Sequence, residues 1–290
     1  YRYYGNMDYF KLSAETGFNH LKDDIALFGD NNPLTCLVCP LGEQDPDDSF
    51  SSVPYEKGFT LLYYLETLIG HANFEKFAKY YINHFKFKTV TSGTFKDTFL
   101  HWCNVPEHKL TDIQINAVKA IDWNDLFHSP GMPKITHDFS NSLSVASKQL
   151  ATEWISSIKN GNYNKKGQFH ANKISTWNTQ QKLIFLDELL NYVDLTATPL
   201  SEDVLKAMDS IYDFTNIENA EIRFKWQNLC IKSEVKWILP YVQDFLLKQG
   251  RMKFTRPLYR MLAASKMGHN MAHELFAQHS QIYHPICRKM

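Results

Sequence analysis

The chain has 290 residues, a length that predicts about two domains. Hydrophobic residues make up 44% and charged residues 21%, which is enough apolar material for buried cores and excludes a disordered chain. Lysine plus arginine (31) equals aspartate plus glutamate (31), so composition gives no electrostatic case for nucleic acid or an anionic membrane surface. No run of about 18 apolar residues occurs, so no membrane span is predicted.

The cysteine count and the first residues bear on location. Five cysteines are too few for a disulfide scaffold, and no secretory apolar segment opens the chain, so a reducing, cytoplasmic compartment is expected. The first residue is Tyr1, so we expect the chain to begin inside a longer protein. Aromatic residues make up 14%, a share typical of proteins that line apolar pockets.

The first fifty residues are expected to be irregular. Gly29–Pro33 (Gly-Asp-Asn-Asn-Pro) is a turn signal, and the apolar run Leu34–Cys39 predicts a short strand.

The pattern becomes helical after residue 50. A serine cap, a proline suited to a first turn and apolar residues at helical spacing predict a helix over about Pro54–Ile69. Further helices are expected over Ala72–Phe85 and Ser92–Cys103. Pro-Gly-Met-Pro at 130–133 breaks any helix and predicts a domain linker.

Beyond the linker, helical patterns alternate with short polar breaks. Successive antiparallel helices with short loops predict a stacked solenoid or a compact bundle. The fold class is therefore mainly α, with some extended chain in the first part and an all-α second part. The expected helices are Ser140–Ile158, Thr176–Val193, Ser201–Tyr212, Asn219–Ile231, Glu234–Gln249, Arg256–Ser265 and Gly268–Gln281.

Metal-binding patterns are incomplete. His269 and His273 are spaced to share a helix face, but Asn270 stands where a zinc peptidase motif needs glutamate. Cys36 and Cys39 form a lone CxxC without the second pair of a structural zinc site. Surface histidines and buried thiols are the simpler interpretation, and a metalloenzyme built on the histidine pair is an alternative.

Tyr55 is the first candidate catalytic residue. It falls in the first turn of an expected helix, where unpaired N–H groups and the dipole create a positive field. A phenol there can donate a hydrogen bond to an oxyanion. The structural alternative is a ring that packs against the helix start.

A basic segment near the end of the chain is a candidate binding site for a carboxylate. Gly250–Leu258 (Gly-Arg-Met-Lys-Phe-Thr-Arg-Pro-Leu) places three cations within six residues. Arg251 and Lys253 can hold a carboxylate, with arginine as the bidentate partner. A solvated basic turn is the alternative.

These two segments together resemble one family. Ser51–Phe59 (Ser-Ser-Val-Pro-Tyr-Glu-Lys-Gly-Phe) and Gly250–Leu258 are similar to the catalytic-tyrosine and carboxylate-recognition stretches of leukotriene A4 hydrolase and its aminopeptidase relatives. Asp122-Trp-Asn with Ser129-Pro-Gly131, and Glu221–Trp226 (Glu-Ile-Arg-Phe-Lys-Trp), match in order, so the resemblance covers essentially the whole chain.

The resemblance implies a fold and an activity. The family consists of zinc peptidases that remove N-terminal residues from short peptides, and its leukotriene branch also opens a fatty-acid epoxide. Residues 1–134 correspond to the second half of a thermolysin-like peptidase domain, and residues 135–290 to a helical, solenoid-like domain.

The resemblance also implies residue roles. Tyr55 takes the place of the oxyanion donor, and Asp47 that of the aspartate that orients water for epoxide opening. Arg251 takes the place of the arginine that holds a free carboxylate, assisted by Lys253. Apolar walls would be lined by Leu37, Cys39, Leu41 and Pro54.

Two departures qualify the resemblance. The family's HExxH and its downstream glutamate are not in this chain, so the zinc ligands are expected upstream of Tyr1 and this segment alone is expected to bind no zinc and to be inactive. Phe50 stands where the leukotriene enzyme carries tyrosine, which favours a plain aminopeptidase. A non-catalytic helical scaffold that lost the zinc site is the alternative, although Tyr55, Arg251 and Asp47 argue against it.

Overall fold

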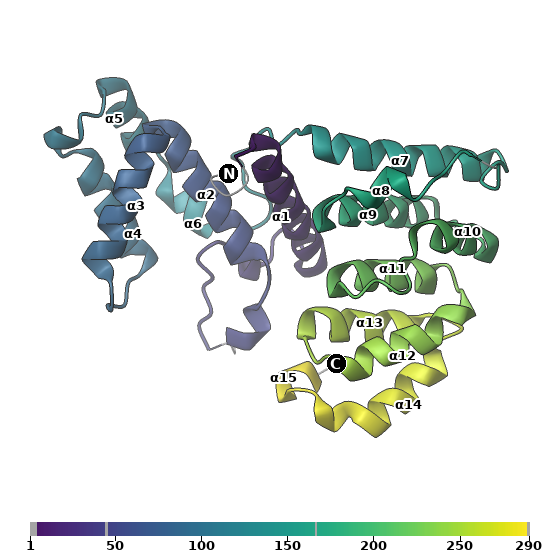
Figure 1. The fold of residues 1–290 in the computed structure, drawn as a ribbon. Helices are drawn as coiled ribbons and strands as arrows, with labels where there is room; N and C mark the ends of the chain where they lie inside the picture. The colour runs from purple at the N-terminus through teal and green to yellow at the C-terminus, as the bar shows by residue number, and fades with distance from the viewer. Residues whose placement is uncertain (1–4, 44–45, 166, 289–290) are drawn as a thin grey trace. The chain divides into compact units, whose positions relative to one another are not determined.

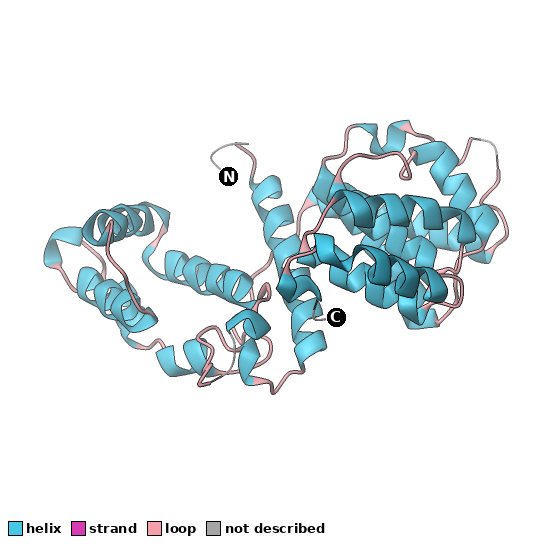
Figure 2. Cartoon of the chain, turned by 90° about the horizontal axis from the view of Figure 1, so that it is seen from below, coloured by secondary structure: helices cyan, strands magenta, loops and turns pink. Residues whose placement is uncertain are grey.

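A computed structural model describes residues 5–43, 46–165 and 167–288, with backbone alone at 47 and 48. The described residues form helices joined by loops and contain no strand, which confirms the mainly α fold class (Figure 2). Contacts divide the chain into two compact units. One runs from Ala14 to Phe139, and the other comprises Ser140 onward together with the residues up to Ser13.

The first long element is a helix that was not predicted from the sequence. Helix α1 spans Met7–Phe28, so the expectation of irregular structure before residue 50 is wrong there. Ala14, Leu21 and Ile25 are buried at helical spacing. An added Cβ at Gly17 would lie 2.1 Å from Oε2 of Glu56, so the flexible end of that side chain would have to move to accommodate a larger residue.

The predicted strand at Leu34–Cys39 is also wrong. Its first residues form the 3-10 helix η1 (Pro33–Thr35), which the Asn32 side chain caps by accepting from the Leu34 N–H at 2.9 Å. The rest bends, and the Val38 N–H donates to the carbonyl of Phe127 at 2.8 Å. Side-chain capping and contacts to a helix end therefore satisfy this backbone in place of a sheet ladder.

Three predicted helices are confirmed to within a residue. After η2 (Pro46–Ser49), helix α2 spans Val53–Ile69, α3 spans His71–Phe85 and α4 spans Ser92–Cys103 (Figure 1). The unit ends with η3 (Pro106–His108), α5 (Asp112–Lys119) and α6 (Trp123–His128). Its core is aromatic and aliphatic, with Leu65, Phe77, Phe99 and Trp102 buried.

The second unit is a stack of helices. Its elements are α7 (Ser142–Lys159), α8 (Asn172–Ser175), α9 (Thr179–Thr196), α10 (Glu202–Tyr212), α11 (Ala220–Lys232), η4 (Lys236–Ile238), α12 (Leu239–Lys248), α13 (Met252–Ala264), α14 (His269–His279), η5 (Ser280–Ile282) and α15 (Pro285–Arg288). Helix α7 packs on α9, α9 on α11, α11 on α13 and α13 on α14, so the layers follow chain order (Figure 1). This arrangement is solenoid-like.

Helix α13 begins earlier than predicted. It starts at Met252 and keeps Pro257 in its interior, whereas the sequence reading started a helix at Arg256. Proline usually breaks a helix interior, which is why the pattern suggested a start beside it. The basic segment is therefore the first turn of a helix, with Arg251 at the N-cap.

The turn at Ser129–Gly131 closes against the segment around residue 30. The Gly131 N–H donates to the hydroxyl of Thr35 at 2.8 Å in a buried position. Gly131 has φ +75°, and an added Cβ would lie 2.8 Å from the carbonyl oxygen of Asp30. Glycine is therefore required both by its backbone conformation and by the close approach of two backbone segments of the chain.

We predict that Gly131→Ala lowers the free energy of unfolding by about 3 kcal/mol, because it adds a backbone clash to the cost of a left-handed residue. Gly29→Ala is the matched control, since Gly29 has φ +95° with open space around its Cβ position. It should cost about 1–2 kcal/mol. Urea unfolding followed by tryptophan fluorescence measures both, and equal losses would contradict the clash.

Candidate functional site

Tyr55 projects from a helix start that is held in place. It is the third residue of α2, and its side chain is 65% exposed. Asp24 of α1 holds Ser52, the N-cap residue of α2, because the Oδ2 of Asp24 accepts from both the N–H and the hydroxyl of Ser52 at 2.6 Å. The phenol has no hydrogen-bond partner among the described residues and can donate to a ligand. The role of Tyr55 as an oxyanion donor stays a prediction.

Lys57 is a buried cation two residues further along α2. Its side chain is 6% exposed, and Nζ donates to the carbonyl of Ser129 at 3.0 Å. Burial lowers the pKa of this ammonium, an effect that nearby Cys36, Cys39 and Asp125 partly oppose. The sequence reading missed Lys57, although it occupies a core position on the helix stripe.

Residues of two sequence motifs position the carbonyl that accepts a hydrogen bond from Lys57. Asp122 caps α6, its Oδ1 accepting from the Asp125 N–H at 3.0 Å. Asp125 accepts in turn from the ammonium of Lys134 and, at 2.7 Å, from the hydroxyl of Ser129, and these hydrogen bonds lower its pKa. The Asp122-Trp-Asn and Ser129-Pro-Gly motifs therefore fix the turn whose carbonyl receives Lys57.

One predicted wall residue lines an apolar cavity. Leu37 contributes to a cavity of about 460 Å³ between α2, α3 and α4, whose walls include Gly58, Leu61, Phe77 and Ile82. Such a lining suits a hydrophobic ligand segment.

The other predicted residues of this region are placed differently. Cys39 donates its thiol to the carbonyls of Leu34 and Cys36, and Leu41 is half-buried. Pro54 and Phe50 are exposed. None of these lines the cavity beside Leu37, and the side chain of Asp47 lies outside the described residues.

The basic segment presents its cations over an aromatic base. The Arg251 guanidinium and the Lys253 ammonium lie 5.3 and 5.5 Å from the ring centroid of Phe254, which is fully buried. Lys253 Nζ also pairs with Glu221 Oε1 at 2.8 Å. Arg251 is exposed and enters no ion pair within the described part of the chain, so it can bind a carboxylate.

The Glu221–Trp226 motif anchors this segment. Arg223 pairs with Asp244 of α12 at 3.2 Å, and Lys225 pairs with Asp187 of α9 at 2.6 Å. Trp226 is buried and donates to the hydroxyl of Thr215 at 3.0 Å. The motif thus fixes α11 against its neighbours. Tyr55 belongs to one unit and Arg251 to the other, and their convergence on one cleft stays a prediction.

No metal centre is found within the described residues, where no group of three or more His, Cys, Asp or Glu side chains is placed to hold an ion. The His269 and His273 rings lie 4.7 Å apart on α14, and His269 Nδ1 donates to the carbonyl of Ala263 at 2.7 Å, but no third ligand joins them. Cys36 is buried and Cys39 half-buried, and burial raises the pKa of both thiols. No described helix is long and apolar enough to span a bilayer.

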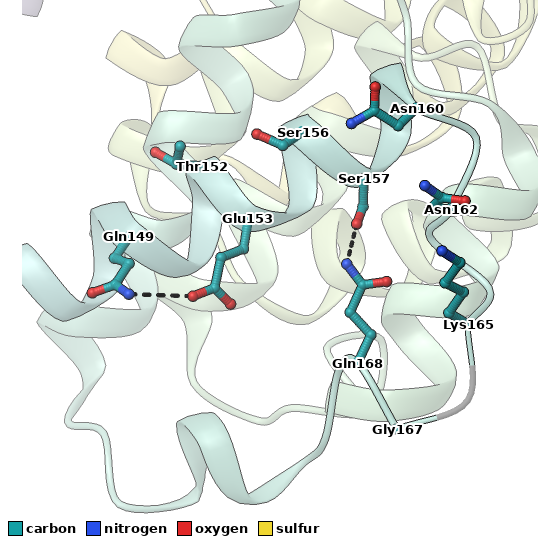
Figure 3. Close-up of a pocket in the computed structure, with 10 residues that line it drawn as sticks. All are labelled: Gln149, Thr152, Glu153, Ser156, Ser157, Asn160, Asn162, Lys165, Gly167 and Gln168. Carbon is teal, nitrogen blue, oxygen red and sulfur yellow. Dashed lines mark hydrogen bonds between the residues drawn. The ribbon is translucent and has the colours of Figure 1, made fainter.

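A polar cavity of about 910 Å³ lies beside α7 (Figure 3). Two pairs of its side chains are hydrogen-bonded, since Gln149 donates to Glu153 at 3.3 Å and Gln168 donates to Ser157, whereas Oε1 of Gln168 is buried without a partner in the described part of the chain. Glu153 also pairs with Lys173 at 2.6 Å. None of the motifs singled out in the sequence lies in this wall.

Comparisons with known proteins agree with this geometry. Residues 11–132 match the family model described as Peptidase family M1 domain, and residues 177–290 match that described as Leukotriene A4 hydrolase, C-terminal. Leucine aminopeptidase 2 of Pyricularia oryzae is 36% identical over 282 residues, which cover 97% of this chain and 43% of that protein. Leukotriene A-4 hydrolase of Xenopus laevis is 34% identical over 286 residues, covering 98% and 44%.

A solved structure of yeast LTA4 hydrolase in complex with Bestatin is similar with a TM-score of 0.84 at 30% identity, covering 98% of this chain and 46% of that one. Fold, motif order and sequence agree that this is a chain of the peptidase M1 class. Within that class, it belongs to the family of leukotriene A4 hydrolases and related leucine aminopeptidases. The chain spans less than half the length of the curated relatives it matches.

We predict that the buried ammonium of Lys57 makes stability depend on alkaline pH. Its pKa is lower in the folded than in the unfolded state, so the folded state releases this proton first as pH rises. The burial penalty on the charge is therefore relieved as pH rises from the folded-state pKa toward about 10.4. The free energy of unfolding of the wild type, relative to Lys57→Met, should increase between pH 8 and pH 10. A constant or falling difference would contradict this.

Proposed function

We propose that the complete protein to which this chain contributes is an aminopeptidase that removes N-terminal residues from short peptides. The observation that supports this most is the exposed phenol of Tyr55 on a helix start braced by Asp24, within a family motif and without a competing partner among the described residues. Relatives named leucine aminopeptidase 2 support the same activity.

In this proposal the two candidate groups act at opposite ends of the substrate. The Tyr55 hydroxyl donates a hydrogen bond to the carbonyl oxygen that gains negative charge as the peptide bond is attacked. Arg251 binds the C-terminal carboxylate through its planar fork of donors, with Lys253 beside it. The substrate class is therefore short peptides with a free C-terminus.

The family's zinc has no fitting site in the residues described, because they contain no group of three suitable ligands. We propose that the metal ligands and the general base come from polypeptide beyond this chain, and that the segment alone is inactive. The cytoplasm is the proposed location, in keeping with five unpaired cysteines.

A fatty-acid epoxide is a second proposed substrate class. Its support is the apolar cavity beside Leu37 and the similarity to a protein named leukotriene A-4 hydrolase. Asp47 is the proposed water-orienting residue. Phe50 lacks the hydroxyl that the resemblance predicts at this position, so the peptide activity is the primary proposal.

A non-catalytic scaffold is the competing function. It predicts that the complete protein hydrolyses no peptide, whatever metal is supplied. It also gives no task to the exposed Tyr55 phenol or to Arg251, which enters no ion pair with the residues that the structure describes. The two experiments that follow therefore separate it from the enzyme.

We predict that Tyr55→Phe in the complete protein lowers kcat about 10²–10³-fold with little change in KM, because one oxyanion donor is lost while substrate contacts remain. Steady-state hydrolysis of a tripeptide measures both constants. Tyr63→Phe is the control, since it makes the same change further along α2. A near-normal kcat in Tyr55→Phe would remove Tyr55 from the catalytic machinery.

We predict that Arg251→Ala raises KM for tripeptides with a free C-terminus and changes it much less for C-terminal amides. A charged hydrogen bond is worth about 1.5–3 kcal/mol, which corresponds to roughly 10- to 100-fold in affinity. Both substrates are compared on the same enzyme preparation. Equal increases for acid and amide would show that the basic segment is only structural.

A further inference from the structure

The charged groups beside Arg251 indicate which substrates the basic segment accepts. We propose that Glu221 is a specificity-determining residue that neutralises Lys253, so that the site accepts one carboxylate and disfavours a ligand with a second carboxylate next to it. This inference rests on the proposed role of Arg251 as the receptor of a C-terminal carboxylate.

The Glu221–Lys253 pair joins two packed helices. Glu221 lies in the first turn of α11 and Lys253 in the first turn of α13, and their charged atoms are 2.8 Å apart. Both side chains are partly exposed, at 31% and 46%, so a ligand can reach the pair. The ammonium is thus satisfied before any ligand arrives.

The aromatic base beneath the cations is buried and packed on two sides. Phe254 is fully buried and packs against Phe224 and Phe245, with ring centroids 5.3 and 5.7 Å away. Arg251 and Lys253 both lie over this ring. Their positions are therefore set by the core, and a change of charge at Glu221 alters the electrostatics without moving the base.

Arg251 is the cation left for the ligand. Its backbone N–H is held by Gln249 at 2.8 Å, while its guanidinium enters no ion pair in the described ranges. Arg251, Lys253 and Glu221 together carry one net positive charge. A single carboxylate neutralises that charge, whereas a second one approaches the Glu221 carboxylate and has to compete with it for Lys253.

The nearby carboxylate of Asp244 is already paired with other cations. Asp244 is held by Arg223 at 3.2 Å and by Lys248 at 2.8 Å. The acid paired to the basic segment is therefore Glu221. The predicted result is discrimination against peptides that end in an acidic residue.

The test uses the complete enzyme and two matched peptides, Leu-Ala-Gln and Leu-Ala-Glu, which share a free C-terminus and differ in one side-chain charge. The wild type should have the lower KM for the peptide ending in glutamine. Glu221→Gln frees Lys253 and should shift the KM ratio about fivefold toward the peptide ending in glutamate, the size of an exposed ion pair. The kcat values should stay the same.

Two further variants make the result specific. Glu218→Gln removes the same charge from an exposed residue three positions earlier and should leave the ratio unchanged. Adding Lys253→Met to Glu221→Gln should abolish the shift. An unchanged ratio in Glu221→Gln, or an equal shift in Glu218→Gln, overturns the inference. Failure of the proposed function appears separately, as an Arg251→Ala enzyme that treats acids and amides alike.

Discussion

The buried ammonium of Lys57 ties the first turns of α2 to a turn far along the chain. A buried cation must keep its hydrogen bond, and the partner here is the carbonyl of Ser129. That carbonyl belongs to a turn that needs glycine at 131. The N–H of Gly131 donates to the hydroxyl of Thr35. The start of α2, the turn after α6 and the segment around residue 35 therefore form one connected structure.

Both candidate groups stand at the beginning of a helix. Tyr55 is in the first turn of α2, and Arg251 occupies the N-cap position of α13 without a side-chain capping bond. Helix N-termini carry a partial positive charge, so each position favours the negative charge that its proposed role assigns to it, a developing oxyanion or a carboxylate. The contacts that hold the two helix starts differ. In the first unit the buried Lys57 binds a carbonyl, and in the second Phe254 and the Glu221–Lys253 ion pair hold the basic segment.

Much of the fold could be predicted from sequence because helix caps and apolar spacing are local signals. Helix α4 was predicted at its observed bounds, and α2 and α3 to within a residue. Helix α1 was missed although its buried residues lie at helical spacing, and the residue that Leu21 and Ile25 pack against, Val53, lies far along the chain. The predicted strand at Leu34–Cys39 does not form, because the described residues offer no second strand with which it could form backbone hydrogen bonds.

The candidate site was predictable only in part. Tyr55 and Arg251 were predicted from sequence motifs, which are read from consecutive residues without knowledge of the tertiary structure, and their roles stay predictions. Lys57 and Glu221 were given no chemical role, because their tasks depend on Ser129 and Lys253, partners that only the tertiary structure brings near.

The layered order of the second unit has a consequence for how it opens. Each layer contacts mainly the one before and the one after, so removal of an outer layer exposes little of the inner ones. Backbone amides in α14 should therefore exchange with deuterium sooner than those in α9, which is covered on both sides by α7 and α11. Protection would then rise layer by layer toward the middle of the stack, and the turn that carries Arg251 lies near its less protected end.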